Sequence, residues 1–151
     1  MLGSLLRGTS LWRSHTVARR ALTTSVAPSP LTDTFGRHHN YLRISLTERC
    51  NLRCQYCMPE EGVDLTPNED LLTSEEISRV LELFVRAGVN KVRFTGGEPL
   101  VRKDISEIIH SAGALPGMES VAITTNAIVL GRKLPSLHAN GLNVVNISLD
   151  T

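Results

Sequence analysis

The sequence lacks two features that would each point to a class of function, and it is poor in a third, cysteine. No apolar run approaches the roughly 20 residues that a membrane-spanning helix requires, so we expect no membrane partner. The net charge of the 151 residues is only +1, whereas nucleic-acid binding requires a basic stripe on the folded part. We therefore expect no nucleic-acid partner. Cysteine is rare as well, because the chain contains only three, all between positions 50 and 57.

Acidic side chains are absent from residues 1–32. This segment carries four arginines and several serines and threonines, and its apolar residues can share one side of a helix. The composition is typical of a mitochondrial transit peptide, whereas a secretory signal has a longer apolar core. We therefore predict that residues 1–32 are a transit peptide and that the protein is located in the mitochondrial matrix. A disordered basic tail without a targeting role is the alternative.

The rest of the chain alternates strand-like and helix-like patterns after a linker at about residues 28–36. Apolar residues recur at helical spacing after a capping box formed by Thr73 and Glu76, and again after Asp104, while Pro135 suits an early position in a third, shorter helix. Alternation of this kind predicts an α/β fold with parallel strands. The expected strands cover residues Tyr41–Thr47, Lys91–Thr95, Ser120–Thr125 and Asn143–Leu149.

These strands alternate apolar and polar residues, although parallel strands covered on both faces usually read as continuous apolar runs. Arg43 and Arg93 occupy polar positions in the middle of the first two strands. The pattern predicts apolar side chains against helices and polar side chains around a ligand cavity, as in a barrel. Chemistry in such barrels gathers at the carboxyl ends of the strands. A sheet with one face in water is the alternative.

Three cysteines follow the first strand with the spacing Cys50-x3-Cys54-x2-Cys57. Soft thiolates select zinc, copper(I) or iron–sulfur clusters, and a closed structural zinc site needs four protein ligands. Three ligands favour a four-iron cluster with one iron left open to a small molecule. A zinc site completed by His38 or His39, and three unlinked buried thiols, are the alternatives. Three cysteines cannot all pair within one chain.

A turn of two glycines follows the second strand, with the sequence Gly96-Gly97-Glu98-Pro99. Glycine lets the backbone approach a ligand closely, and the Glu98 carboxylate offers a charged acceptor for an amine. Alone the turn is a weak signal, but its expected place beside the cysteines strengthens it.

The segment LRISLTERCNLRCQYCMP resembles the signature of radical S-adenosylmethionine enzymes, and so do RFTGGEPLVRKDI, AITTNA and NVVNISLD, in that order. The likeness covers residues 35–151. Within this superfamily the chain resembles the GTP 3′,8-cyclase family, because of the RFTGGEPL context and the arginine seven residues before Cys50. The resemblance implies a partial (β/α)6 TIM-like barrel, of which residues 33–151 form the first four strand–helix units.

The resemblance also implies roles for nine residues. Cys50, Cys54 and Cys57 would hold a [4Fe-4S] cluster whose open iron binds S-adenosylmethionine. Tyr56, Gly97 and Ser148 would contact S-adenosylmethionine. Arg43, Arg93 and Thr124 would contact GTP, and they coincide with inward polar positions found from the alternation. Ion pairs of the arginines with Glu98 or Asp150 are the alternative.

The implied function is a lyase that converts GTP to 3′,8-cyclo-7,8-dihydroguanosine triphosphate, the first step of molybdopterin synthesis. Glu48 and Ala127 depart mildly from the family pattern, which often has Asp and Gly there. The chain also provides no cysteine for the second, C-terminal cluster that the full-length family members use, so we expect it to be inactive alone. A truncated isoform that binds a cluster or a partner, and another radical enzyme acting on a peptide, are the alternatives. The sequence does not indicate the electron donor, and a homodimer of the full-length form is possible.

Overall fold

The computed structural model describes residues 29–149 of the chain. The predicted transit peptide therefore lies outside the described residues, except for residues 29–32. These four contact the folded unit, since the Ser29 hydroxyl donates to the Ala87 carbonyl at 3.3 Å and the His39 N–H donates to the Leu31 carbonyl at 2.8 Å.

Four parallel strands form one sheet in the order β1-β2-β3-β4. The strands are β1 (Tyr41–Ser45), β2 (Lys91–Thr95), β3 (Ser120–Thr125) and β4 (Val144–Ile147). The helices are α1 (Ser74–Arg86), α2 (Ile105–Gly113) and α3 (Leu130–Ala139), with short 3-10 turns η1 (Asn68–Asp70) and η2 (Pro99–Val101). The predicted α/β fold with parallel strands is confirmed, but the fourth unit is a strand without a helix among the described residues.

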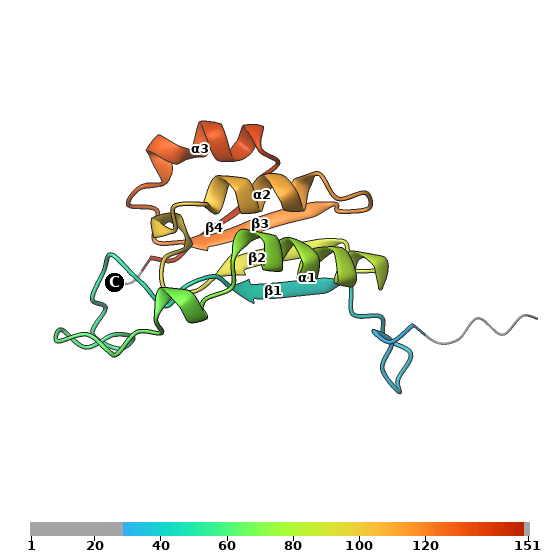
Figure 1. Ribbon diagram of the computed structural model, residues 1–151, viewed down its shortest axis with the longest axis horizontal. Helices are drawn as coiled ribbons and strands as arrows, with labels where there is room; N and C mark the ends of the chain where they lie inside the picture. The colour runs from blue at the N-terminus through green and yellow to red at the C-terminus, as the bar shows by residue number, and fades with distance from the viewer. Residues whose placement is uncertain (1–28, 150–151) are drawn as a thin grey trace, which may run out of the picture.

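The three helices lie on one face of the sheet, and the loop that carries the cysteines extends beyond the carboxyl ends of the strands (Figure 1). Apolar side chains from the strands meet those of the helices in a single core. Phe94, Ile123 and Leu81 are each fully buried there. Burial on this scale contributes roughly 2 kcal/mol for each large side chain.

The capping box predicted for α1 is present in the structure. The Glu76 N–H donates to Thr73 Oγ1 at 3.2 Å, and the Thr73 N–H donates to Glu76 Oε2 at 2.9 Å. Gly88 ends the helix with a φ of 108°, a conformation that glycine adopts without a steric penalty.

The predicted start of α2 is confirmed, because Asp104 directly precedes Ile105, the first residue of the helix. The Asp104 carboxylate binds Arg102 and does not cap the helix. One predicted helix detail is wrong. Pro135 is not an early residue of α3 but lies inside the helix, where its ring removes one backbone hydrogen bond.

The apolar residues at the end of strand β4 are less buried than the predicted packing against helices suggests. Val145 packs against the core, but Ile147 and Leu149 are 52% and 82% exposed. No helix among residues 29–149 is long and apolar enough to cross a membrane.

Candidate functional site

A cavity of about 240 Å³ lies where the cysteine loop meets the carboxyl ends of the strands. We call it the cysteine cavity. Eight of the nine residues predicted from the sequence line it: Arg43, Cys50, Cys54, Tyr56, Cys57, Gly97, Thr124 and Ser148. The other lining residues are Leu52, Thr95, Gly96, Thr125 and Asn126.

The ninth predicted residue, Arg93, lies beside Arg43, because the ladder between β1 and β2 makes these two residues direct partners. Paired residues of neighbouring parallel strands point to the same face of the sheet. Their neighbours in the two strands, Leu42, Ile44, Val92 and Phe94, belong to the core or pack against it, so both arginines lie on the opposite face of the sheet. The sequence pattern correctly predicted this polar face.

The cysteine loop presents three thiols with graded exposure. Cys50 and Cys54 are half-buried and Cys57 is exposed, and no disulfide joins them. The N–H groups of Cys57 and Met58 both donate to the Cys54 carbonyl at 2.9 Å. The Leu52 N–H donates to Cys50 Sγ at 3.4 Å, and hydrogen bonds of this kind to sulfur tune the potential of iron–sulfur clusters.

The donor set fits a cluster in its chemistry, since three thiols line one cavity and no His, Asp or Glu among residues 29–149 lines it with them. In residues 29–149, no three His, Cys, Asp or Glu side chains are gathered closely enough to hold a single metal ion.

The alternative of a zinc site completed by His38 or His39 is wrong. His38 lies before β1, where its ring contacts Thr32 at 3.3 Å and the Gly88 carbonyl at 3.4 Å. The cysteines follow β1, so the five residues of that strand separate them from the histidines. An extended strand of this length spans roughly 17 Å.

The glycine turn is required by the protein's own backbone. A Cβ added at Gly96 would meet the carbonyl of Thr47, and one added at Gly97 would meet the carbonyls of Glu48 and Arg49. The Gly97 N–H donates to the Thr47 carbonyl at 2.7 Å. The turn after β2 is thus pressed against the segment that leaves β1 and leads to the cysteines.

Glu98 is not the exposed acceptor that the sequence suggested, because it is 0% exposed. Its Oε1 accepts hydrogen bonds from the Thr125 hydroxyl at 2.8 Å and the Leu100 N–H at 3.0 Å. Its Oε2 accepts one from the Asn126 N–H at 2.7 Å. These bonds satisfy the buried carboxylate within the protein, as burial of a charge requires.

The two arginines pair with no carboxylate among the described residues, and Asp150 lies outside them. Arg43 Nε donates to Thr95 Oγ1 at 3.4 Å. The Arg93 guanidinium lies 5.9 Å from the ring centre of Tyr41, and its Nε is buried without a hydrogen bond. The ion pair with Glu98 proposed as an alternative is therefore wrong. Adjacent guanidiniums without a counter-charge suit an anionic ligand, which they can bind through planar forks.

Tyr41 contacts Arg93, one of the predicted site residues, and the sequence reasoning missed this contact. Its ring lies under the Arg93 guanidinium and restricts it, a cation–π contact in the usual distance range. The signal was available, because Tyr41 lies two residues before Arg43 and so on the same face of the strand.

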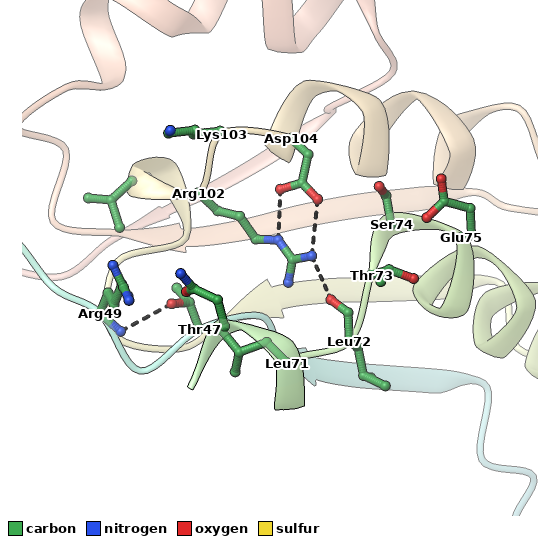
Figure 2. Close-up of a pocket in the computed structure, with 12 residues that line it drawn as sticks. Thr47, Arg49, Leu71, Leu72, Thr73, Ser74, Glu75, Arg102, Lys103 and Asp104 are labelled. Carbon is green, nitrogen blue, oxygen red and sulfur yellow. Dashed lines mark hydrogen bonds and ion pairs between the residues drawn. The ribbon is translucent and has the colours of Figure 1, made fainter. Parts of the chain in front are cut away.

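A larger cavity of about 580 Å³ lies near the first residues of α1 and α2, and no cysteine lines it (Figure 2). Its centre is the Arg102 side chain, which donates to both oxygens of Asp104 at 2.7 and 3.0 Å. The same guanidinium donates to the carbonyls of Leu46 at 2.8 Å and Leu72 at 2.6 Å. Arg102 therefore ties together three segments of the fold. We take the smaller cavity, where the thiols lie, as the candidate functional site.

Hydrogen bonds lower the pKa of two carboxyl groups near these cavities, those of Asp104 and Glu48. Hydrogen bonds from the Arg102 side chain hold the pKa of Asp104 below its usual value. Hydrogen bonds from the N–H and hydroxyl of Thr66 hold the pKa of Glu48 below its usual value. The latter bonds, 2.9 and 3.0 Å long, close the base of the segment that carries the cysteines.

Comparison with known proteins gives one family and several close relatives. The sequence profile of the Radical SAM superfamily matches residues 44–151. "Molybdenum cofactor biosynthesis protein 1" of Dictyostelium discoideum is 64% identical over 121 residues, which cover 80% of this chain and 19% of that protein. "GTP 3′,8-cyclase, mitochondrial" of Arabidopsis thaliana is also 64% identical over 121 residues, or 31% of its length.

Among solved structures, the Streptococcus suis protein SuiB bound to its precursor peptide SuiA matches with a TM-score of 0.56 and 25% identity. The match covers 74% of this chain and 24% of SuiB. The chain thus spans less than a third of the length of each of these proteins.

Proposed function

Because this chain belongs to the Radical SAM superfamily, we propose that it carries the cofactor-binding part of a mitochondrial GTP 3′,8-cyclase. The observation that carries this proposal is the cysteine cavity, which gathers eight of the nine residues expected from the cyclase family. The ninth, Arg93, is the ladder partner of a lining residue. Close relatives with cyclase and molybdenum cofactor names support the same assignment.

Cys50, Cys54 and Cys57 would hold a [4Fe-4S] cluster. When bound, the cluster and S-adenosylmethionine supply the one-electron chemistry that removes a hydrogen atom from a substrate. The Leu52 N–H, at 3.4 Å from Cys50 Sγ, would stabilise the thiolate form of that ligand.

Tyr56, Gly97 and Ser148 would bind S-adenosylmethionine. All three line the cysteine cavity, and Tyr56 is 77% exposed, so its ring is accessible to a flat ligand. Gly97 is exposed at the cavity wall, so its backbone is accessible there.

Arg43, Arg93 and Thr124 would bind GTP. Neighbouring guanidiniums on one face of the sheet offer forked donors to phosphate or purine oxygens, and Thr124 lies in the next row of the same face. The Tyr41 ring limits the rotation of Arg93 and so lowers the entropy that is lost on binding.

The first test is anaerobic reconstitution of the full chain with iron and sulfide. We expect a four-iron EPR signal in the reduced protein that shifts when S-adenosylmethionine is added. A matched Cys57→Ser variant should lose the signal. Reconstituted wild-type chain without a cluster, or with a signal that S-adenosylmethionine does not change, would contradict the proposal.

The second test concerns substrate and turnover. We expect radiolabelled GTP to bind the reconstituted chain and Arg43→Ala to weaken that binding roughly tenfold, the effect of losing one charge-assisted contact. We expect no cyclic product from these 151 residues without the remainder that full-length relatives have. Formation of that product would show that the chain is active alone.

Residues 1–32 would direct the protein to the mitochondrial matrix, as their composition and the name of the plant relative suggest. Import of a fusion of residues 1–32 with a reporter into isolated mitochondria tests this. A reporter that stays outside would overturn the assignment.

A further inference from the structure

A side-chain hydrogen bond joins the cysteine loop to the end of β3. Asn126 Nδ2 donates to Asn51 Oδ1 at 2.7 Å, although 75 positions separate the two residues. Asn51 is the neighbour of Cys50, and Asn126 follows the last residue of β3. The bond therefore connects a loop to the rigid sheet at the rim of the cysteine cavity.

Both halves of the Asn126 amide have partners, which fixes its orientation. Its Oδ1 accepts from the Ile128 N–H at 3.1 Å, so its nitrogen must face Asn51. An amide whose oxygen is already bound to a backbone donor can offer only its NH₂ group in the other direction.

The backbone of Asn126 is held in turn by Glu98. The Asn126 N–H donates to Glu98 Oε2 at 2.7 Å, and the other carboxylate oxygen binds Thr125 and Leu100. A fully buried carboxylate with three donors is rigid, because removing any of these bonds leaves a buried polar group unsatisfied. One end of this chain of contacts is the cysteine loop, and the other end is the buried Glu98 carboxylate.

On the other side of Cys50, the backbone is also tied to the sheet, because the Glu98 N–H donates to the Arg49 carbonyl at 2.8 Å. Arg53 Nη1 donates to the carbonyls of Cys50 at 3.1 Å and Leu52 at 3.0 Å, which shapes the loop without fixing it to the sheet. A bond to the sheet restricts where Cys50 lies relative to the turn after β2.

We propose that Glu98, Asn126 and Asn51 form a positioning relay that holds Cys50 in place for the cluster. Glu98 fixes the Asn126 backbone, Asn126 holds Asn51, and Asn51 fixes the adjacent ligand. The inference rests on the proposed function, in that Cys50 must be a cluster ligand for the relay to matter. None of the three residues needs to touch the cluster or the substrate.

A double-mutant cycle tests the relay in the full chain. The variants are Asn51→Ala, Asn126→Ala and the double variant, with Asn68→Ala as a control because Asn68 is an exposed asparagine of η1. The measurement is the rate at which a chelator removes the cluster, followed by visible absorbance. We expect each single variant to lose the cluster about fivefold faster, the effect of one neutral hydrogen bond.

The double variant should be no faster than either single variant, because the two side chains make one shared bond. A double variant that loses the cluster about 25-fold faster than wild type, as two independent fivefold effects would give, would overturn the relay. Single variants that behave like the Asn68→Ala control would overturn it as well. The EPR shift on adding S-adenosylmethionine gives a second readout, which we expect to be smaller or broadened in the single variants.

A cluster-independent readout separates failure of the relay from failure of the proposed function. In the apo chain, the alkylation rate of Cys50, measured by peptide mass spectrometry, should rise severalfold in Asn126→Ala while that of Cys57 stays unchanged. Wild-type chain that takes up no cluster would contradict the proposed function. Wild-type chain with a cluster, but with unchanged alkylation and chelation in the variants, would contradict the relay alone.

Glu98→Gln tests the buried end of the relay. In this variant an NH₂ group replaces one carboxylate oxygen and faces a hydrogen-bond donor, which is unfavourable. Cluster loss should therefore be faster than in Asn126→Ala. Circular dichroism of this variant shows whether the sheet has folded, and if it has not, the asparagine cycle decides the question. A folded Glu98→Gln chain that holds its cluster as well as wild type would overturn the role of Glu98.

Discussion

Ala127 is the single non-glycine residue with a positive φ among residues 29–149, at 65°. It follows Asn126, and its N–H donates to Thr125 Oγ1 at 3.0 Å. Left-handed backbone costs an L-residue roughly 1–2 kcal/mol, so the turn after β3 is strained where it leads into the relay. The side chains of the two preceding residues hold it there, because Thr125 accepts from the Ala127 N–H and Asn126 accepts from the Ile128 N–H.

This strain predicts that Ala127→Gly stabilises the chain. We expect the free energy of unfolding to rise by about 0.5–1 kcal/mol, because glycine removes the steric cost but adds entropy to the unfolded state. Urea denaturation followed by circular dichroism measures the change. As a control, Ala139→Gly in the last turn of α3 should lower stability. A fall in stability for Ala127→Gly would show that the turn is not strained.

The Arg102–Asp104 pair predicts a pH dependence in the acid range. The pKa of Asp104 is lowered from its usual 3.8 by the Arg102 side chain, so the folded state favours the ionised form. Its contribution is fully present above the unfolded pKa and is lost as the pH falls through the lower folded value.

Urea midpoints of wild type and Asp104→Asn should therefore differ by a constant amount above about pH 5 and converge towards about pH 2. The comparison with Asp104→Asn removes the contributions of other carboxylates. A difference that is the same at every pH would contradict a role for this titration.

At the scale of the elements, the close fit between the β1 exit and the turn after β2 explains why glycine is required at two successive positions. Gly97→Ala places a Cβ against the carbonyls of Glu48 and Arg49. Gly131 offers a contrast, because a Cβ there meets nothing within 4 Å and the residue lies in α3.

We expect Gly97→Ala to destabilise the chain by about 2 kcal/mol, since overpacking against backbone cannot be relieved by a rotamer change. Gly131→Ala should instead stabilise it by up to about 1 kcal/mol, the difference in helix propensity. Thermal melts of the two variants give the comparison. Equal effects of the two substitutions would contradict the argument.

The sequence predicted the elements well where local rules decide. The capping box of Thr73 and Glu76, the helix end at Gly88 and the alternation that places Arg43 on the polar face are all encoded within a few residues. The role of Glu98 could not be predicted, because its partners Thr125 and Asn126 are distant in the chain. The same holds for Asn51, whose contact exists only once β3 is in the sheet. Pro135 was misplaced because the start of α3 has no capping side chain to mark it.

At the scale of the whole molecule, the helices cover one face of the sheet and β4 forms one edge. An exposed edge strand offers unpaired backbone groups to another chain. Val144 and Ile147 add apolar surface to this edge, at 38% and 52% exposure.

The edge predicts self-association of the 151-residue chain when it is expressed alone. Ile147→Lys should shift the distribution of sedimentation coefficients towards that of a monomer, because a lysine on an edge strand discourages pairing with another chain. We expect little change in the melting temperature of this variant. Arg79→Lys, an exposed substitution in α1, is the control. A wild-type chain that sediments as a monomer at high concentration would contradict this expectation.

The register between β1 and β2 places Arg43 beside Arg93. Two like charges on adjacent strands repel each other, and the hydrogen-bonded ladder holds them together at the strand spacing of roughly 4.8 Å. An anion that binds both guanidinium groups would cancel this repulsion. Binding of the anion would therefore stabilise the sheet. The stability of the pairing between β1 and β2 would then depend on whether an anion is bound to Arg43 and Arg93.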